Sequence, residues 1–272
     1  MSPSVAELAP FTYVQVDTTT QAHVATVTLN RPELHNAFNE VFIDELCRVF
    51  TTLGEHPDIR VVVLQALGKS FCAGADLNWM KKMIDYNLDE NVEDARGLAR
   101  MLKAVRTCPK PVIAKVQGAA YGGGVGLISA CDMAVCLDSC SFGLTEVKLG
   151  LLPAVISPFV LEKIGPGHAS RYFLTAEMFS AQEAQRIGLV SSVVADDADV
   201  DAQVATWVKA LTHNAPEAVS VCKRMIFQVY NAMWEPAEEV TCRLIAERRV
   251  SSEGQEGLTA FIDKRKPHWV AG

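Results

Sequence analysis

Residues 71–77 read FCAGADL, and residues 118–124 read GAAYGGG. Each stretch places small residues at the end of an apolar run that is typical of a strand. Small residues at such a point let a ligand come close to the main chain, because little side chain covers the backbone N–H groups. The two stretches therefore predict a site built from the backbone at two strand ends.

A carboxylate follows in an apolar stretch, FGLTE at residues 142–146. A buried carboxyl group binds its proton more tightly, which suits acid–base work near neutral pH. Two N–H groups that hold an oxyanion and one carboxylate that moves a proton suit chemistry on a thioester. Two alternatives stay open at this point: Glu146 as a core residue paired with Lys148, and the glycine run as a tight turn before a helix over 125–130.

The composition is that of an enzyme with one large domain or a domain with an appendage. The chain has 272 residues, 49% hydrophobic content and a formal charge of −7, which argues against a nucleic-acid binder. The eight cysteines include no Cys-x-x-Cys pair, and no histidine lies near the group at 131, 136 and 140. We expect no metal site and cysteines that act as small buried hydrophobes in a reducing compartment.

Three common motifs are excluded. The tripeptide GKS at 68–70 lacks the earlier glycine of a phosphate-binding Walker loop, because position 63 is valine. The glycine run does not fit the Gly-x-Gly-x-x-Gly spacing of dinucleotide sites. No Gly-x-Ser-x-Gly elbow of a serine hydrolase is present.

Strand and helix patterns alternate up to about Val194, which predicts an α/β core. Three helical segments, near 199–213, 216–232 and 235–264, then predict a helical tail, so we divide the chain into 1–197 and 198–272. The charged segment 78–94 is interpreted as a surface loop or lid. No targeting signal or bilayer-length apolar stretch is recognisable, so we expect a cytoplasmic protein without membrane contact.

Together these segments resemble the enoyl-CoA hydratase/isomerase (crotonase) superfamily over nearly the whole chain. The ordered landmarks are LNRP at 29–32, FCAGADL at 71–77, GGG at 122–124, CD at 131–132, FG at 142–143, LGLLP at 149–153 and FIDKRKP at 261–267. The resemblance implies a spiral of ββα units with a C-terminal helical region that forms a homotrimer or a dimer of trimers.

The resemblance also assigns roles by position. It implies that Ala75 and Gly123 supply the two oxyanion N–H groups and that Glu146 is a catalytic glutamate. The other residues that it places against substrate or coenzyme A are Leu34, Ala37, Lys69, Ala73, Asp76, Leu77, Tyr121, Gly126, Phe261 and Lys264, the last two on this or a neighbouring subunit. No separate cofactor is expected, because coenzyme A is part of the acyl-CoA thioester substrate.

One position departs from the two-glutamate pattern of the hydratases, which carry their second glutamate where this chain has Gly126. We interpret Gly126 as room for a substituent at C3 of the acyl group. The stretches 74–80, 124–127 and 153–160 are similar to bacterial methylglutaconyl-CoA hydratases of leucine breakdown, and enzymes acting on isohexenylglutaconyl-CoA are closely similar.

The resemblance therefore implies reversible hydration of 3-methylglutaconyl-CoA to 3-hydroxy-3-methylglutaryl-CoA. The rivals are hydration of isohexenylglutaconyl-CoA, isomerisation by the lone Glu146, and a binding protein for nucleic acid or a partner that uses the basic residues 264–266. The acidity of the chain weighs against the last of these.

Overall fold

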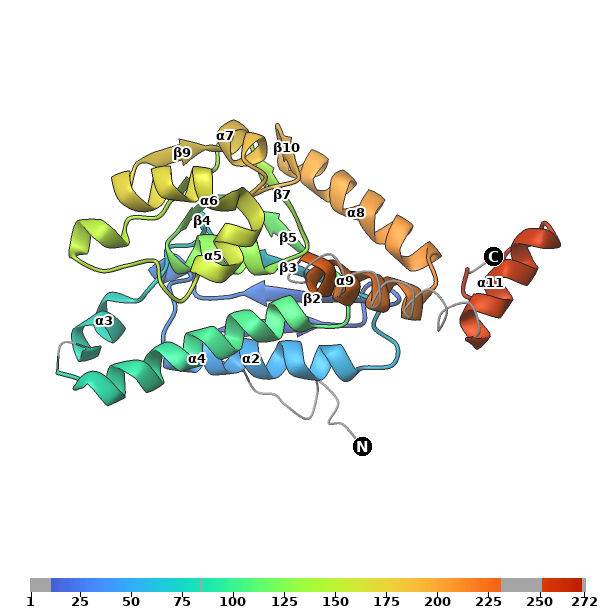
Figure 1. Ribbon diagram of the computed structural model, residues 1–272, viewed down its shortest axis with the longest axis horizontal. Helices are drawn as coiled ribbons and strands as arrows, with labels where there is room; N and C mark the ends of the chain where they lie inside the picture. The colour runs from blue at the N-terminus through green and yellow to red at the C-terminus, as the bar shows by residue number, and fades with distance from the viewer. Residues whose placement is uncertain (1–10, 84, 231–250, 271–272) are drawn as a thin grey trace.

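The computed structural model describes residues 11–83, 85–230 and 251–270, and the side chains of 258, 261 and 262 lie outside this description. A six-stranded sheet forms the centre of the described part (Figure 1). Its strands, in spatial order, are β1 (Val14–Asp17), β2 (Val24–Leu29), β3 (Val61–Ala66), β5 (Val112–Val116), β7 (Met133–Leu137) and β10 (Ser192–Val194). β1 runs antiparallel to β2, and every other pair is parallel. Continuous apolar runs such as residues 61–64 suit such strands, because both faces of the sheet are covered.

A second sheet of four short strands carries the site. Its order is β4 (Ser70–Cys72), β6 (Ala119–Tyr121), β8 (Ser141–Gly143) and β9 (Met178–Ser180), and the first three are parallel. β3 leads into β4, β5 into β6 and β7 into β8, so each unit gives one strand to each sheet before a helix follows. This repeated path is the spiral of ββα units that the sequence predicted, and it confirms the expected α/β fold.

Helices surround the two sheets or, as with the last of them, pack on another helix. They are α2 (Glu40–Glu55), α3 (Leu77–Met83), α4 (Leu88–Thr107), α5 (Gly123–Ala130), α6 (Ser157–Thr175), α7 (Ala181–Arg186), α8 (Asp197–His213), α9 (Pro216–Tyr230) and α11 (Ser252–Ile262), with short 3-10 turns η1 (Pro32–Leu34) and η2 (Glu146–Leu149). α2 and α4 lie alongside each other below the large sheet in the view of Figure 1. Phe42, Leu46 and Phe50 of α2 are fully buried and recur at helical spacing, which explains why this segment folds as a core-facing helix.

The interpretation of residues 78–94 as a loop is wrong. The Asp76 carboxylate accepts hydrogen bonds from the N–H groups of Asn78 and Trp79 and thereby caps α3. A reciprocal capping box between Asn87 and Glu90 opens α4. The charged residues of this segment occupy exposed helical faces, which the charge pattern alone does not distinguish from a loop.

The helical tail is present in the described part of the chain. α8 packs directly on the large sheet, where Val208 is buried against Val24, Val61 and Ile113. By contrast, none of the residues of α9 is buried. Residues 231–250, which include the end of the predicted second segment and the first part of the third, lie outside the description. None of the described helices is long and apolar enough to cross a membrane.

Candidate active site

Three adjacent parallel strands of the small sheet end at the same edge. β4 is followed by residues 73–76, β6 by Gly122 and Gly123, and β8 by the segment that leads to Glu146. The carboxyl ends of parallel strands are where ligands bind in α/β proteins, because the chain leaves the sheet there and exposes backbone groups. The sheet thus brings together the three segments that the sequence analysis selected.

The two glycine-containing turns approach each other closely. Gly74 has φ +89°, a conformation that suits glycine, and a Cβ on it would lie 3.0 Å from the Tyr121 carbonyl oxygen and 3.7 Å from the Gly123 nitrogen. Gly122 donates its N–H to the Gly143 carbonyl oxygen at 2.9 Å, which fixes the second turn to β8. The backbone at Gly74 and the backbone at Gly123 are therefore neighbours across the strand ends.

The orientation of the Ala75 N–H follows from its pairing with Phe38. Phe38 donates to the Gly74 carbonyl oxygen at 2.7 Å, and Asp76 donates to the Phe38 carbonyl oxygen at 2.8 Å. In this parallel bridge the N–H of Ala75 points away from Phe38, because successive N–H groups of an extended chain alternate in direction. Gly123 is the first residue of α5, where an N–H has no acceptor within the helix. Both N–H groups are thus available to a ligand.

Glu146 lies against the second turn. A Cβ on Gly122 would lie 2.9 Å from Glu146 Oε1, so the carboxylate rests on the bare Cα of Gly122. Glu146 Oε2 is buried and has no hydrogen-bond partner among the described residues. Burial raises the pKa of Glu146 above its ordinary value, although the residue's own backbone N–H opposes the shift. This isolation disfavours the alternative of a core glutamate paired with Lys148, whose side chain is exposed.

Asp76 directly follows Ala75, and its buried side chain links this turn to two other segments. Its carboxylate forms an ion pair with Arg31 at 2.7 Å, and both side chains are nearly fully buried. It also accepts the two N–H groups that begin α3. With these partners the carboxylate fixes the turn that carries Ala75, and the substrate contact that the resemblance implies for Asp76 stays a prediction.

The residues expected at the coenzyme A end lie along one loop and the turn beside it. Leu34 ends η1 and is 42% exposed, and Ala37 is buried with its carbonyl oxygen bound to Arg31 Nη1. Lys69 is exposed in the turn before β4, and Ala73 donates its N–H to the His35 carbonyl oxygen at 3.0 Å. The structure therefore places these four residues on neighbouring segments.

Asn36 joins these segments, and the sequence analysis did not identify it. Its side chain is fully buried and binds the Arg31 N–H together with the carbonyl oxygens of Leu67 and Ser70. His35 and Asn36 both have positive φ, at 52° and 54°. Two consecutive left-handed residues are uncommon, and asparagine tolerates this conformation well, which is the signal that a closer reading of the sequence could have used.

Two further predicted residues border the turns. Tyr121 directs its hydroxyl group to Ser141 Oγ at 3.1 Å, so this contact competes with any role in holding water. Leu77 is 74% exposed at the start of α3 and is available to a ligand that lies over Ala75.

The interpretation of Gly126 as open space is wrong in this structure. A Cβ on Gly126 would lie 2.4 Å from Ile156 Cγ2 and 2.7 Å from Ile156 Cβ. Ile156 itself is 3% exposed. The missing side chain at position 126 accommodates Ile156 and therefore reflects close packing between α5 and the start of α6.

Phe261 and Lys264 are not brought to the site within one chain. The Phe261 backbone belongs to α11, and its side chain lies outside the described residues. Lys264 follows α11 as an exposed residue with φ 54°. α11 lies at the opposite end of the molecule from α3 in Figure 1. A role for these residues on a neighbouring subunit stays a prediction.

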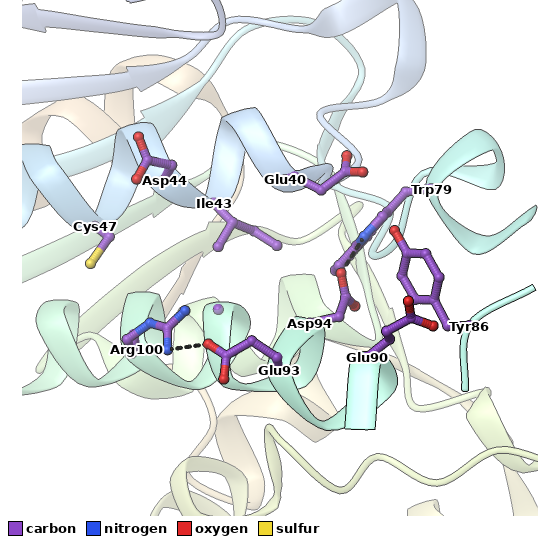
Figure 2. A pocket seen from close by; sticks show the side chains of 11 residues that line it. Glu40, Ile43, Asp44, Cys47, Trp79, Tyr86, Glu90, Glu93, Asp94 and Arg100 are labelled. Atoms are coloured by element: carbon purple, nitrogen blue, oxygen red, sulfur yellow. Dashed lines mark hydrogen bonds and ion pairs between the residues drawn. The ribbon is translucent and has the colours of Figure 1, made fainter. Parts of the chain in front are cut away.

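A hollow of about 520 Å³ lies between α2 and α4 and is distinct from these strand ends (Figure 2). Five of its lining residues are acidic and only Arg100 is basic; the lining consists of Glu40, Ile43, Asp44, Cys47, Trp79, Tyr86, Glu90, Glu93, Asp94, Gly97 and Arg100. Trp79 Nε1 donates to Asp94 at 2.9 Å and closes the hollow toward α3. This excess of carboxylates repels anionic ligands such as phosphates, so the hollow does not suit coenzyme A.

The family model described as enoyl-CoA hydratase/isomerase matches residues 19–271. The chain belongs to the enoyl-CoA hydratase/isomerase family. A solved enoyl-CoA hydratase from Shewanella pealeana is 41% identical, with a TM-score of 0.90, and the match covers 95% of this chain and 96% of the other. The helices and sheets described above thus form the fold of this family, and an acyl-CoA thioester is the class of substrate consistent with it.

Relatives with different named activities are similarly distant. The mevalonyl-coenzyme A hydratase sidH of Aspergillus fumigatus is 34% identical over 256 residues, which cover 91% of each chain. The peroxisomal Delta(3,5)-Delta(2,4)-dienoyl-CoA isomerase of Arabidopsis thaliana is 31% identical over 261 residues, which cover 92% of this chain and 94% of the relative. Overall similarity to enoyl-CoA hydratase/isomerase family members therefore does not distinguish hydration from isomerisation, and the site geometry has to decide.

Proposed function

We propose that this protein adds water reversibly to a C3-branched enoyl-CoA that carries a remote carboxylate, with 3-methylglutaconyl-CoA as the leading substrate. The observation that carries this proposal is the half-buried Glu146 carboxylate, which rests on Gly122 beside the N–H of Gly123 and whose Oε2 is buried without a hydrogen-bond partner among the described residues. A group in this position can move protons at the carbon atoms next to a thioester carbonyl whose oxygen is bound at Gly123.

In the proposed reaction, the thioester oxygen accepts hydrogen bonds from the N–H groups of Ala75 and Gly123. The Glu146 carboxylate removes a proton from water as the water oxygen bonds to C3 of the acyl group. The electrons of the double bond move toward the thioester oxygen, where the two N–H groups stabilise the resulting enolate. Protonated Glu146 then gives its proton to C2, so one carboxyl group serves as base and acid.

Two considerations support a branched acyl group, and the first of them also supports an acidic one. The sequence is similar to methylglutaconyl-CoA hydratases in the segments around Ala75, Gly123 and Ile156. A relative of the chain is named as a hydratase of mevalonyl-coenzyme A, a thioester with a methyl branch at C3. For the remote carboxylate, Lys82 already pairs with Glu40 at 2.7 Å, which leaves Lys81 and Lys148 as the better candidate partners.

Isomerisation is the second candidate, and the single carboxylate favours it. A Cβ at Gly122 would meet the Glu146 carboxylate. A Cβ at Gly126, the position of the second glutamate in the hydratases, would meet the apolar Ile156 instead. One carboxylate suffices to move a proton between two carbon atoms, whereas hydration also has to position a water molecule. The same site is therefore chemically competent for a shift of the double bond.

One assay separates the two reactions. The protein is incubated with 3-methylglutaconyl-CoA, isohexenylglutaconyl-CoA, crotonyl-CoA and a 3-enoyl-CoA, and the products are identified by mass. Hydration adds the mass of water, and isomerisation leaves the mass unchanged. We expect the fastest turnover with water addition to 3-methylglutaconyl-CoA. Turnover of the 3-enoyl-CoA alone would replace the proposal with isomerisation.

Assembly into a homotrimer or a dimer of trimers in the cytoplasm is part of the same proposal. It is supported by α9, whose apolar side chains Ile226, Phe227 and Tyr230 are exposed in the single chain. Apolar faces of this kind usually pack against another surface.

A further inference from the structure

The start of α6 contributes a residue to which no role in the reaction has been assigned. Ile156 immediately precedes α6, its side chain is 3% exposed, and it packs on the bare Cα of Gly126 in α5. Any side chain at position 126 would need the volume that Ile156 now fills. The glycine and the isoleucine therefore act as a matched pair.

This pair lies next to the Glu146 carboxylate. Gly126 donates its N–H to the Gly122 carbonyl oxygen at 3.1 Å, which closes the first turn of α5. Residues four apart in a helix lie on one face, separated by roughly 6 Å along the axis. Glu146 rests on the first of these glycines and Ile156 on the second, so the carboxylate and the isoleucine occupy successive positions on one face of α5.

The surroundings of Glu146 agree with an apolar neighbour. Oε2 is buried without a hydrogen-bond partner among the described residues, and burial raises the pKa of the carboxyl group. A polar side chain in the place of Ile156 would put a hydrogen-bonding group on the same face of α5 as the carboxylate, one turn away. Isoleucine offers neither a donor nor an acceptor, and its branched side chain has little freedom to turn away.

We propose that Ile156 determines substrate specificity: it forms an apolar wall beside the Glu146 carboxylate that accepts an alkyl substituent of the acyl group and excludes water from that side. This inference rests on the proposed function. It predicts that the branch of the substrate, and not its remote carboxylate, faces α6. It also predicts that water for hydration approaches from the side opposite Ile156.

The test uses two substitutions, Ile156→Val and Ile156→Thr. Valine and threonine have nearly the same shape, but threonine has a hydroxyl group where valine has a methyl group. Both are assayed for kcat/KM on 3-methylglutaconyl-CoA and on crotonyl-CoA over a range of pH. The matched controls are Ile59→Val and Ile59→Thr, because Ile59 is also 3% exposed and packs at the amino end of β3, away from the strand ends of the site.

We expect Ile156→Val to lower the ratio of branched to unbranched kcat/KM by about tenfold, the smaller end of what one methylene group contributes in an apolar pocket. We expect Ile156→Thr, relative to Ile156→Val, to move the acid limb of the pH profile to lower pH, because a hydroxyl group stabilises the carboxylate form. Neither change should occur in the Ile59 variants.

Two results would overturn the assignment. If the Ile156 variants keep the parent's substrate ratio and pH profile while the unfolding temperature falls as in the Ile59 variants, Ile156 is a packing residue only. If Ile156→Thr does not fold, the substrate ratio of Ile156→Val decides alone. A parent protein that turns over none of the enoyl-CoA thioesters would instead overturn the proposed function, and this inference with it.

Discussion

Arg31 and Asp76 form a buried ion pair, with Arg31 Nη2 2.7 Å from Asp76 Oδ2, and this pair ties the loop after β2 to the turn that carries Ala75. The same carboxylate caps α3 through Asn78 and Trp79. The Asp76 side chain therefore connects three segments: the loop expected to bind coenzyme A, the turn that carries Ala75, and α3.

Loss of Asp76 should destabilise the fold strongly. Asp76→Ala leaves Arg31 buried without its partner, which costs about 3–5 kcal/mol. Burial alone would raise the pKa of Asp76, but the N–H groups of Asn78 and Trp79 and the Arg31 guanidinium hold it below its ordinary value. The stabilisation that Asp76 provides is thus present above the pKa that its carboxyl group has in the unfolded chain. It is lost as pH falls through the pKa of the same group in the folded protein. Urea unfolding at neutral and acidic pH measures both effects, with Asp76→Asn as the variant that keeps a capping oxygen but removes the charge.

Glu146→Gln should remove the proton transfer and keep the shape of the site. We expect kcat to fall by about 10²–10⁴-fold, the usual contribution of general acid–base catalysis, with binding of the acyl-CoA roughly unchanged. Steady-state kinetics and calorimetric binding of a substrate analogue measure the two quantities. Glu55→Gln, at an exposed residue of α2, is the control and should behave as the parent. A Glu146→Gln variant that keeps most of its kcat would refute the assignment.

The same variant should be more stable than the parent at alkaline pH. The raised pKa means that folded Glu146 holds its proton at a higher pH than the unfolded chain does, so the parent loses stability as pH rises between the two pKa values. Glutamine has no such loss. The difference in Tm between variant and parent should therefore be larger at pH 8 than at pH 5, and an equal difference at both would show that burial does not penalise the ionised form.

The N–H of Gly123 can be removed by a substitution to proline. Gly123 is the first residue of α5, a position that tolerates proline. Any Cβ there lies 3.0 Å from the Phe38 ring, so Gly123→Ala reproduces the contact while it keeps the N–H. We expect Gly123→Pro to lose about 10²–10³-fold in kcat relative to Gly123→Ala. Equal activities would make Gly123 a turn residue only.

Position 126 should be coupled to Ile156 in stability. Gly126→Ala overpacks the contact and should cost about 1–3 kcal/mol, whereas with Ile156→Ala present the added Cβ should cost less. A double-mutant cycle on urea unfolding measures this coupling. Gly97→Ala, whose Cβ would meet only Ile43 Cγ2 at 3.9 Å, is the control and should stabilise α4 by about 0.5–1 kcal/mol. Additive effects at 126 and 156 would contradict the close contact.

The exposed face of α9 should be covered in solution. Ile226 is 57% exposed in the single chain. We expect sedimentation of the parent to show trimers or hexamers and Ile226→Glu to shift the population to smaller species. Gln228→Glu adds the same charge on an exposed position of α9 and should leave the assembly unchanged. A monomeric parent would mean that the tail only caps the core, and a role for Phe261 and Lys264 on a partner would then fail.

Most of the fold was predictable because strands with both faces buried have unbroken apolar runs, as at residues 61–64, and because α2 repeats its apolar residues at helical spacing. The apolar spacing from Val92 to Val105 predicted most of α4, but α3 and the first turn of α4 were missed. Their caps, Asp76 and Asn87, act through hydrogen bonds that the pattern does not reveal. Gly126 was misinterpreted for a related reason. A glycine in a sequence does not indicate which distant residue fills the space beside it. The contact between Gly126 and Ile156 is recognised only in the three-dimensional structure.

The strand ends of the small sheet have a consequence for redesign of this protein. Neighbouring parallel strands are about 4.8 Å apart, a spacing dictated by the backbone and not by any side chain. The Ala75 turn follows β4 and the Gly123 turn follows β6, so the pairing of these two strands sets the separation of the two N–H groups proposed to bind the thioester oxygen. If the proposed site is correct, substitutions in α3 or at the start of α6 should change which acyl group is accepted without a change in the spacing of the two N–H groups.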